Sequence, residues 1–277
     1  MRWPRFTFVV LCASMVWVSA IFGMPHHYSQ AIRLALIILG LAAVFVPALL
    51  LGAALAKDSR SRVRGIAGLA LVAPVGLFAF LPGFGPPDAV SASENYVRYV
   101  ILLAGSVCLG MGLLLLSGSV QEDRSALLGQ VARTTALLAT PLYIVWATVL
   151  VQIVTIMSLP GHSATGPWLR WVSDWSDIVL FAAGVLSYLC AAALSGALLE
   201  TRLIGKGLAV AFSTISLFAA ALLLMRGLRF PNPAEAFRHW YTIPGWIAGI
   251  PAVPWMVPAF IGAVCLRGRS RDRGASG

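Results

Sequence analysis

The chain has 277 residues, of which 59% are apolar and 11% are charged, with a formal net charge of +10. Soluble domains carry charged residues at about a quarter of their positions, so this composition excludes an ordinary soluble protein and indicates a membrane protein. At about 20 residues per crossing, the length accommodates eight spans with short connections and no soluble catalytic domain beside them.

Eight apolar runs predict an all-α polytopic membrane helix bundle with eight transmembrane helices. In chain order, the predicted spans are Phe6–Met24, Ile32–Ala56, Ile66–Phe84, Val97–Val120, Ala136–Met157, Ile178–Leu199, Leu208–Met225 and Ile243–Leu266. We expect one membrane domain over residues 1–266 and a basic tail over residues 267–277. An alternative is that the first run is a signal cleaved after Val18-Ser19-Ala20, which would leave seven spans in the same orientation. The run continues to Met24, beyond the length of a usual signal core, which favours an uncleaved anchor.

The basic residues are distributed unevenly between the two sides of this topology. One side holds fourteen of the twenty lysines and arginines, and the ten carboxylates divide equally, so the two sides carry +9 and +1. The positive-inside rule therefore predicts that both termini are cytoplasmic in a multi-pass protein of a bacterial inner membrane. The partners that we expect are the lipid bilayer and other membrane proteins, and not nucleic acid.

Small residues predict where helices approach each other closely. Ala183, Ser187, Ala191 and Ser195 recur at every fourth position of the sixth span and so form one stripe along it. The fourth span carries Gly105, Gly110 and Gly112, which also favour tight packing. The four cysteines are isolated in sequence and are interpreted as small packing residues.

The residue types within the spans exclude several classes of chemistry. No span centre carries a histidine or a carboxylate, which argues against an ion-coupled carrier with a mid-membrane acid and against haem held by two histidines within the bilayer. The sequence also has no His-Glu-x-x-His motif, no glycine-rich phosphate loop and no paired carboxylates at catalytic spacing. We therefore do not expect an enzyme.

All four histidines fall in loops on the side predicted to face outward: His26, His27, His162 and His239. Imidazole with a nearby thioether, such as that of Met24, suits a soft or borderline metal, so the sequence predicts a copper site at the outer face. The alternative is that these histidines lie at the headgroup level without binding a metal.

The loop before the sixth span carries Trp168, Trp171 and Trp175, spaced by three and four residues. This spacing predicts a short helix along the membrane surface with its tryptophans on one face. The alternative is a platform for haem, flanked by the outer histidines.

Two further segments are candidates for a solute path. Thr148, Gln152 and Thr155 form a polar stripe on the fifth span that leads toward His162, and we expect it to face protein or water rather than lipid. Interhelical hydrogen bonding is the alternative role for this stripe.

The eighth span carries Pro251, Pro254 and Pro258, which would leave the carbonyls of Ile247, Ile250 and Pro254 without their helical partners. Broken backbone at membrane depth is tolerated where it is buried in protein or lines a cavity. The segment is therefore either a binding or gating element or a kinked packing helix.

Between Ser158 and Leu199 the sequence resembles the bacterial copper-resistance D family of eight-span membrane proteins. Gly161-His162-Ser163-Ala164 is similar to the family's Gly-His element, and Asp174 followed by Ala182-Ala183-Gly184 is similar to the start of its next helix. Asp177 stands where the family has a histidine, and the first span has no histidine. The resemblance covers about 40 residues and implies copper uptake or handling at the outer face.

The sequence thus predicts a transporter-like or copper-handling membrane protein. The rival from another class is a non-enzymatic anchor or assembly subunit of a membrane complex, in which the small-residue seams contact other proteins. A third hypothesis is a redox component that handles haem or quinone.

Overall fold

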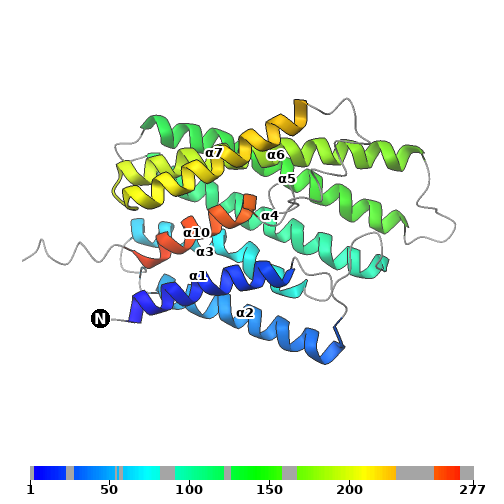
Figure 1. The fold of residues 1–277 in the computed structure, drawn as a ribbon, viewed down its shortest axis with the longest axis horizontal. Helices are drawn as coiled ribbons and strands as arrows, with labels where there is room; N and C mark the ends of the chain where they lie inside the picture. Colours follow the sequence, from blue (N-terminus) through cyan, green and yellow to red (C-terminus); the bar gives the residue numbers. More distant parts are fainter. Residues whose placement is uncertain are drawn as a thin grey trace, which may run out of the picture.

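A computed structural model describes residues 3–22, 28–53, 55, 59–81, 91–121, 126–157, 167–228 and 253–268. Within these residues every regular element is helical, which confirms the predicted all-α class (Figure 1). The α-helices are α1 (Trp3–Phe22), α2 (Gln30–Ala53), α3 (Ser59–Leu77), α4 (Ala92–Gln121), α5 (Ala126–Met157), α6 (Pro167–Glu200), α7 (Lys206–Leu228) and α10 (Val253–Arg267), and the short helix η1 (Phe78–Phe80) follows α3.

Seven of these helices, α1 to α7, are long and apolar enough to cross a membrane, so the chain is a multi-pass membrane protein. All seven start before the predicted spans, and the margin is largest for α6 at Pro167, α5 at Ala126 and α3 at Ser59. These extra turns carry polar and charged residues, which a helix tolerates where it leaves the hydrocarbon. Of the predicted eighth span, the structure describes only the part from Val253 onward, as the 15-residue helix α10.

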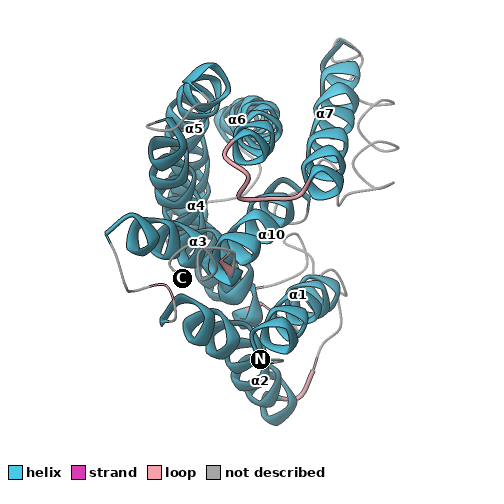
Figure 2. Cartoon of the chain, turned by 90° about the vertical axis from the view of Figure 1, so that its left-hand side faces the viewer, coloured by secondary structure: helices cyan, strands magenta, loops and turns pink. Residues whose placement is uncertain are grey.

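The helices α3, α4, α5 and α6 pack in sequence order, each against the next. Viewed along the bundle, α1 and α2 lie on one side and α7 on the other, with α10 between them (Figure 2). The last helix packs mainly against α3 and also contacts α1, α2 and α6, which ties the C-terminal part of the chain to its first half.

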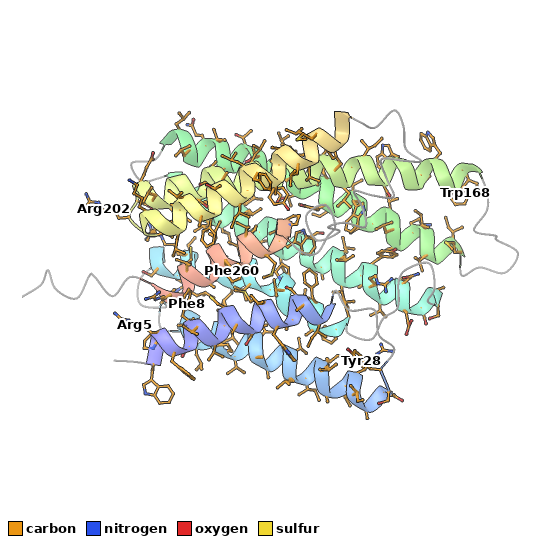
Figure 3. The ribbon with its side chains drawn as sticks, in the orientation of Figure 1. Arg5, Phe8, Tyr28, Trp168, Arg202 and Phe260 are labelled. Carbon is orange, nitrogen blue, oxygen red and sulfur yellow. The ribbon has the colours of Figure 1, made fainter. Side chains whose placement is uncertain are left out.

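The two ends of the bundle differ in their residues. Arg5 and Arg202 lie at one end, which we call the basic end, and Tyr28 and Trp168 lie at the opposite end (Figure 3). At the basic end the guanidinium of Arg267 lies 4.9 Å from the centre of the Phe8 ring, a cation–π contact that joins the end of α10 to the start of α1. The start of α1 and the end of α10 therefore lie at the same end of the bundle.

The predicted close approaches between helices are confirmed. All four residues of the stripe on α6, from Ala183 to Ser195, are buried. A side chain at Gly105 would collide with Trp255, one at Gly110 with Thr140, and one at Gly112 with Leu71. These glycines therefore let neighbouring helices pack directly against the backbone of α4.

One close contact was not predicted. A Cβ atom at Gly262 of α10 would lie 2.7 Å from the carbonyl oxygen of Gly68 in α3, and one at Gly68 would lie 2.9 Å from the carbonyl oxygen of Gly262. The two backbones thus touch where both helices lack a side chain. This contact, hereafter the Gly68–Gly262 crossing, holds α10 on α3.

Candidate functional site

Three polar side chains from three helices meet in the interior of the bundle. Tyr143 lies near the middle of α5, Ser187 lies near the middle of α6, and Trp255 lies at the start of α10. None of the three side chains is more than 2% exposed. We call them the mid-depth cluster, because the helices that supply Tyr143 and Ser187 extend well beyond them in both directions.

The Trp255 indole is fixed by aromatic and backbone contacts. Its ring stacks on Phe78 with the centroids 5.4 Å apart and the planes at 25°, and Tyr143 meets it edge-on at 5.8 Å and 89°. Gly105 provides the space, because a Cβ there would lie 2.6 Å from the Cζ3 atom of Trp255. Offset and edge-to-face contacts of this kind favour one orientation of the rings.

Two hydrogen-bond donors in the mid-depth cluster have no acceptor within the described part of the chain. The hydroxyl of Tyr143 and the Nε1–H of Trp255 are buried and have no hydrogen-bond partner in the described part of the chain. The Ser187 hydroxyl and the Trp255 indole face the Tyr143 hydroxyl but do not meet hydrogen-bond geometry with it. Leaving a buried polar group unsatisfied costs about 1–3 kcal/mol, so each donor indicates a place for an acceptor.

Ser187 supplies a hydrogen bond that the backbone of α10 lacks. Residue 258 is a proline, so the carbonyl of Pro254 lacks the amide that a helix normally offers it. The Ser187 hydroxyl donates to this carbonyl oxygen instead, at 3.4 Å. The predicted loss of a partner at the Pro254 carbonyl is thus confirmed, and its replacement comes from the small-residue stripe of α6.

The described part of α10 begins within the bundle. From Val253 to Arg267 it extends about 22 Å. Since Arg267 lies at the basic end, Pro254 and Trp255 lie about halfway along the bundle, beside Tyr143 and Ser187 (Figure 1).

No residue that forms these contacts is charged. The group consists of Pro74, Phe78, Gly105, Tyr143, Ser187, Pro254 and Trp255. The site therefore offers two neutral donors and aromatic surface. This combination suits an acceptor oxygen on an uncharged molecule rather than a cation.

The structure places the predicted solute-path residues in two groups. Pro254 and Pro258 are buried in α10 and belong to or adjoin the cluster, whereas Pro251 lies outside the described residues. Thr148, Gln152 and Thr155 are exposed on the outer surface of α5. Within the described part of one chain this polar stripe therefore lies on the side of α5 away from the mid-depth cluster, and the solute path along it stays a prediction.

The two threonines of that stripe satisfy their hydroxyls locally. Thr148 donates to the carbonyl of Ile144 at 2.7 Å, and Thr155 donates to that of Val151 at 2.8 Å. A short hydroxyl one turn along a helix reaches such a carbonyl, which explains why these residues can lie on an outer surface.

The predicted metal ligands His26, His27, His162 and His239 all lie outside the described residues. Within residues that are described, no group of three or more histidine, cysteine, aspartate or glutamate side chains could hold a metal ion. The copper site therefore stays a prediction from sequence.

The tryptophan-rich segment is helical, but it is not a separate surface helix. Trp168, Trp171 and Trp175 are all exposed and share one face, as their spacing predicts. However, α6 runs without a break from Pro167 to Glu200, so these residues form the first turns of a membrane-spanning helix at the end opposite the basic end (Figure 3). The predicted orientation along the membrane surface is wrong because no breaker separates the segment from the span.

Three charged side chains described at the same end are paired or buried. Arg33 of α2 and Glu94 of α4 form a salt bridge with a 3.4 Å N–O distance. Arg98, only 7% exposed, donates to the Oδ1 atom of Asn95 at 2.5 Å. The Arg33–Glu94 pair joins the starts of α2 and α4, whereas the Arg98–Asn95 contact lies within α4.

Comparisons of the chain with protein-family models, with curated proteins and with solved structures found no match. Arguments about function therefore rest on the geometry of this chain.

The sequence patterns do not predict Tyr143 as a site residue, and they predict Ser187 only as a packing residue of the small-residue stripe. Tyrosine and tryptophan count as apolar in a span, so their polar atoms do not stand out. The available signal was the proline four residues after Pro254, which marks a carbonyl in need of a donor.

Proposed function

We propose that the chain is a transporter-like membrane protein that binds a small uncharged solute in the mid-depth cluster. The observation that carries this proposal is a pair of buried donors without an acceptor among the described residues, Tyr143 of α5 and Trp255 of α10. Secondary transporters bind their substrates near the bilayer midplane, between packed helices. The proposed activity is binding and movement without covalent chemistry.

The chemistry of the cluster defines the class of solute. A carbonyl or similar oxygen would accept from the Tyr143 hydroxyl and the Trp255 indole, and an apolar or aromatic body would contact Phe78. Because no charged side chain among the described residues contributes to the cluster, a full charge on the solute would lack a counter-ion there and would be costly to bury. A quinone is one molecule with the required carbonyl and ring.

The distribution of charge supports an orientation in which the basic end faces the cytoplasm of a bacterial inner membrane. Copper handling at the outer face, through His162 with His26, His27 and His239, stays a separate proposal that rests on the sequence and on the copper-resistance D resemblance.

Solvent access to Ser187 tests the proposed site. In a background with all four native cysteines changed to alanine, we expect Ser187→Cys to react with a small water-soluble thiosulfonate reagent in membrane vesicles, because a solute path must open to water. Ser195→Cys is the matched control, since Ser195 is equally buried two turns further along the same stripe and bonds only within its own helix. Equal lack of reaction at both positions would show that the cluster is only packing.

A further inference from the structure

The outer surface of α5 carries a continuous seam of exposed residues. Leu138, Pro141, Val145, Thr148, Gln152 and Thr155 are all exposed and are separated alternately by three and four positions. An average spacing of 3.5 residues is the period at which two helices keep one seam in contact while crossing at a shallow angle. This set, hereafter the α5 seam, thus has the pattern of a helix-packing surface with no helix of the described chain upon it.

Gln152 is the residue of the α5 seam that needs a partner. Its side chain is exposed and has no hydrogen bond to any described residue, while the flanking hydroxyls of Thr148 and Thr155 already donate to their own helix. It lies within the apolar span from Leu127 to Met157, five residues before the helix ends. An amide facing hydrocarbon without a partner is costly, because lipid tails offer neither donors nor acceptors.

A second copy of the chain meets this need by symmetry. Two copies in one membrane share an orientation, so a twofold axis along the membrane normal places the two α5 helices parallel and the two Gln152 side chains at the same depth. A glutamine amide carries both a donor and an acceptor, so it is complementary to itself and two of them form reciprocal hydrogen bonds. Partners of other composition would need a polar group at that depth, whereas the second copy supplies one by construction.

We propose that the protein forms a parallel homodimer through the α5 seam, with the two Gln152 amides hydrogen-bonded to each other across the twofold axis. The seam lies on the face of α5 opposite to the buried Tyr143 side, so the dimer leaves the mid-depth cluster intact. The inference is independent of the proposed transport function, and either can fail alone.

The mass of the purified protein in mild detergent tests the dimer directly. We expect the wild-type chain to be dimeric and Gln152→Leu to weaken the dimer about five- to tenfold in dissociation constant, as the loss of two modest membrane hydrogen bonds implies. Gln130→Leu is the matched control, because Gln130 is an exposed glutamine nearer the basic end of the same helix, and it should leave the dimer unchanged. A monomeric wild type, or equal masses for wild type and Gln152→Leu across dilution, would overturn the proposal.

Cysteine crosslinking in native membranes tests the geometry of the seam. Single cysteines at positions 148 to 155, in the background without native cysteines, should form disulfide-linked dimers most readily at 148, 152 and 155 and least at 150 and 154, which lie off the seam. Uniform crosslinking along the helix, or crosslinks only to other proteins, would exclude the symmetric arrangement. The second result would favour an assembly-subunit role instead.

Discussion

Tyr143 and Thr148 lie five residues apart on α5, and their hydroxyl groups are in opposite situations. Tyr143 is 2% exposed and its hydroxyl has no partner among the described residues, whereas Thr148 is exposed and donates to the carbonyl of Ile144 at 2.7 Å. The difference comes from the distance between each hydroxyl and the backbone of its own helix. A threonine hydroxyl can turn back to its own helix, but a phenol is held too far from that backbone.

A short hydroxyl is satisfied by its own helix whether it is exposed, as in Thr148, or buried, as in Ser106 and Ser195. The Tyr143 hydroxyl and the Trp255 indole have no such local acceptor. The proposed solute site and the proposed dimer rest on these different situations of polar groups inside and outside the bundle.

The largest expected effect comes from filling the space beside Trp255. Gly105→Val would force a side chain to within 2.6 Å of the Trp255 ring, so we expect the free energy of unfolding to fall by about 3 kcal/mol. Gly118→Val on the same helix is the control, because nothing lies within 4 Å of a Cβ there. Thermal unfolding in detergent measures both. Similar losses for the two variants would mean that the indole is not fixed where the structure has it.

A smaller loss is expected at the broken backbone of α10. Ser187→Ala removes the donor to the Pro254 carbonyl and should lower the free energy of unfolding by about 1 kcal/mol. Ser195→Ala removes only a bond to Ala191 one turn earlier in the same helix, so its effect should be within about 0.5 kcal/mol. The difference between the two serines, measured by the same unfolding assay, isolates the contact between α6 and α10. No difference would indicate that the Pro254 carbonyl has another donor.

The smallest expected change concerns the two hydroxyls of the opening comparison. Tyr143→Phe removes a donor that lacks an acceptor, so the protein without solute should keep its unfolding free energy or gain up to about 1 kcal/mol. Thr148→Val, the surface counterpart, should change it by less than about 0.5 kcal/mol. A clear loss of stability in Tyr143→Phe would show that the phenol is already hydrogen-bonded in the free protein.

Local patterns predicted much of the fold. The apolar runs gave the seven long helices, and the glycines of α4 and the stripe from Ala183 to Ser195 marked surfaces that the structure shows in contact. Spacing also placed Trp168, Trp171 and Trp175 on one face. These features depend on residues within a few turns of each other, which is the range over which helical periodicity carries information.

The candidate site could not be predicted in the same way. Trp255 meets Gly105 and Phe78, residues more than 140 positions away along the chain, and no local period encodes such a contact. Periodicity showed that Thr148, Gln152 and Thr155 share a face, but not whether that face is inside or outside the bundle. The direction of a stripe depends on the neighbours of its helix, and those follow from tertiary packing.

The Gly68–Gly262 crossing fixes the point about which α10 can tilt. The two backbones are in contact there, and Arg267 packs on the Phe8 ring nearby, so α10 cannot slide easily along α3 at the basic end. Trp255, further from that end, is held by side chains. Trp255 is seven residues from Gly262, a lever arm of about 10 Å, and a tilt of about 10° would swing its indole by about 2 Å. A small tilt of α10 would then be enough to separate the ring from Phe78, without any rearrangement of the seven long helices.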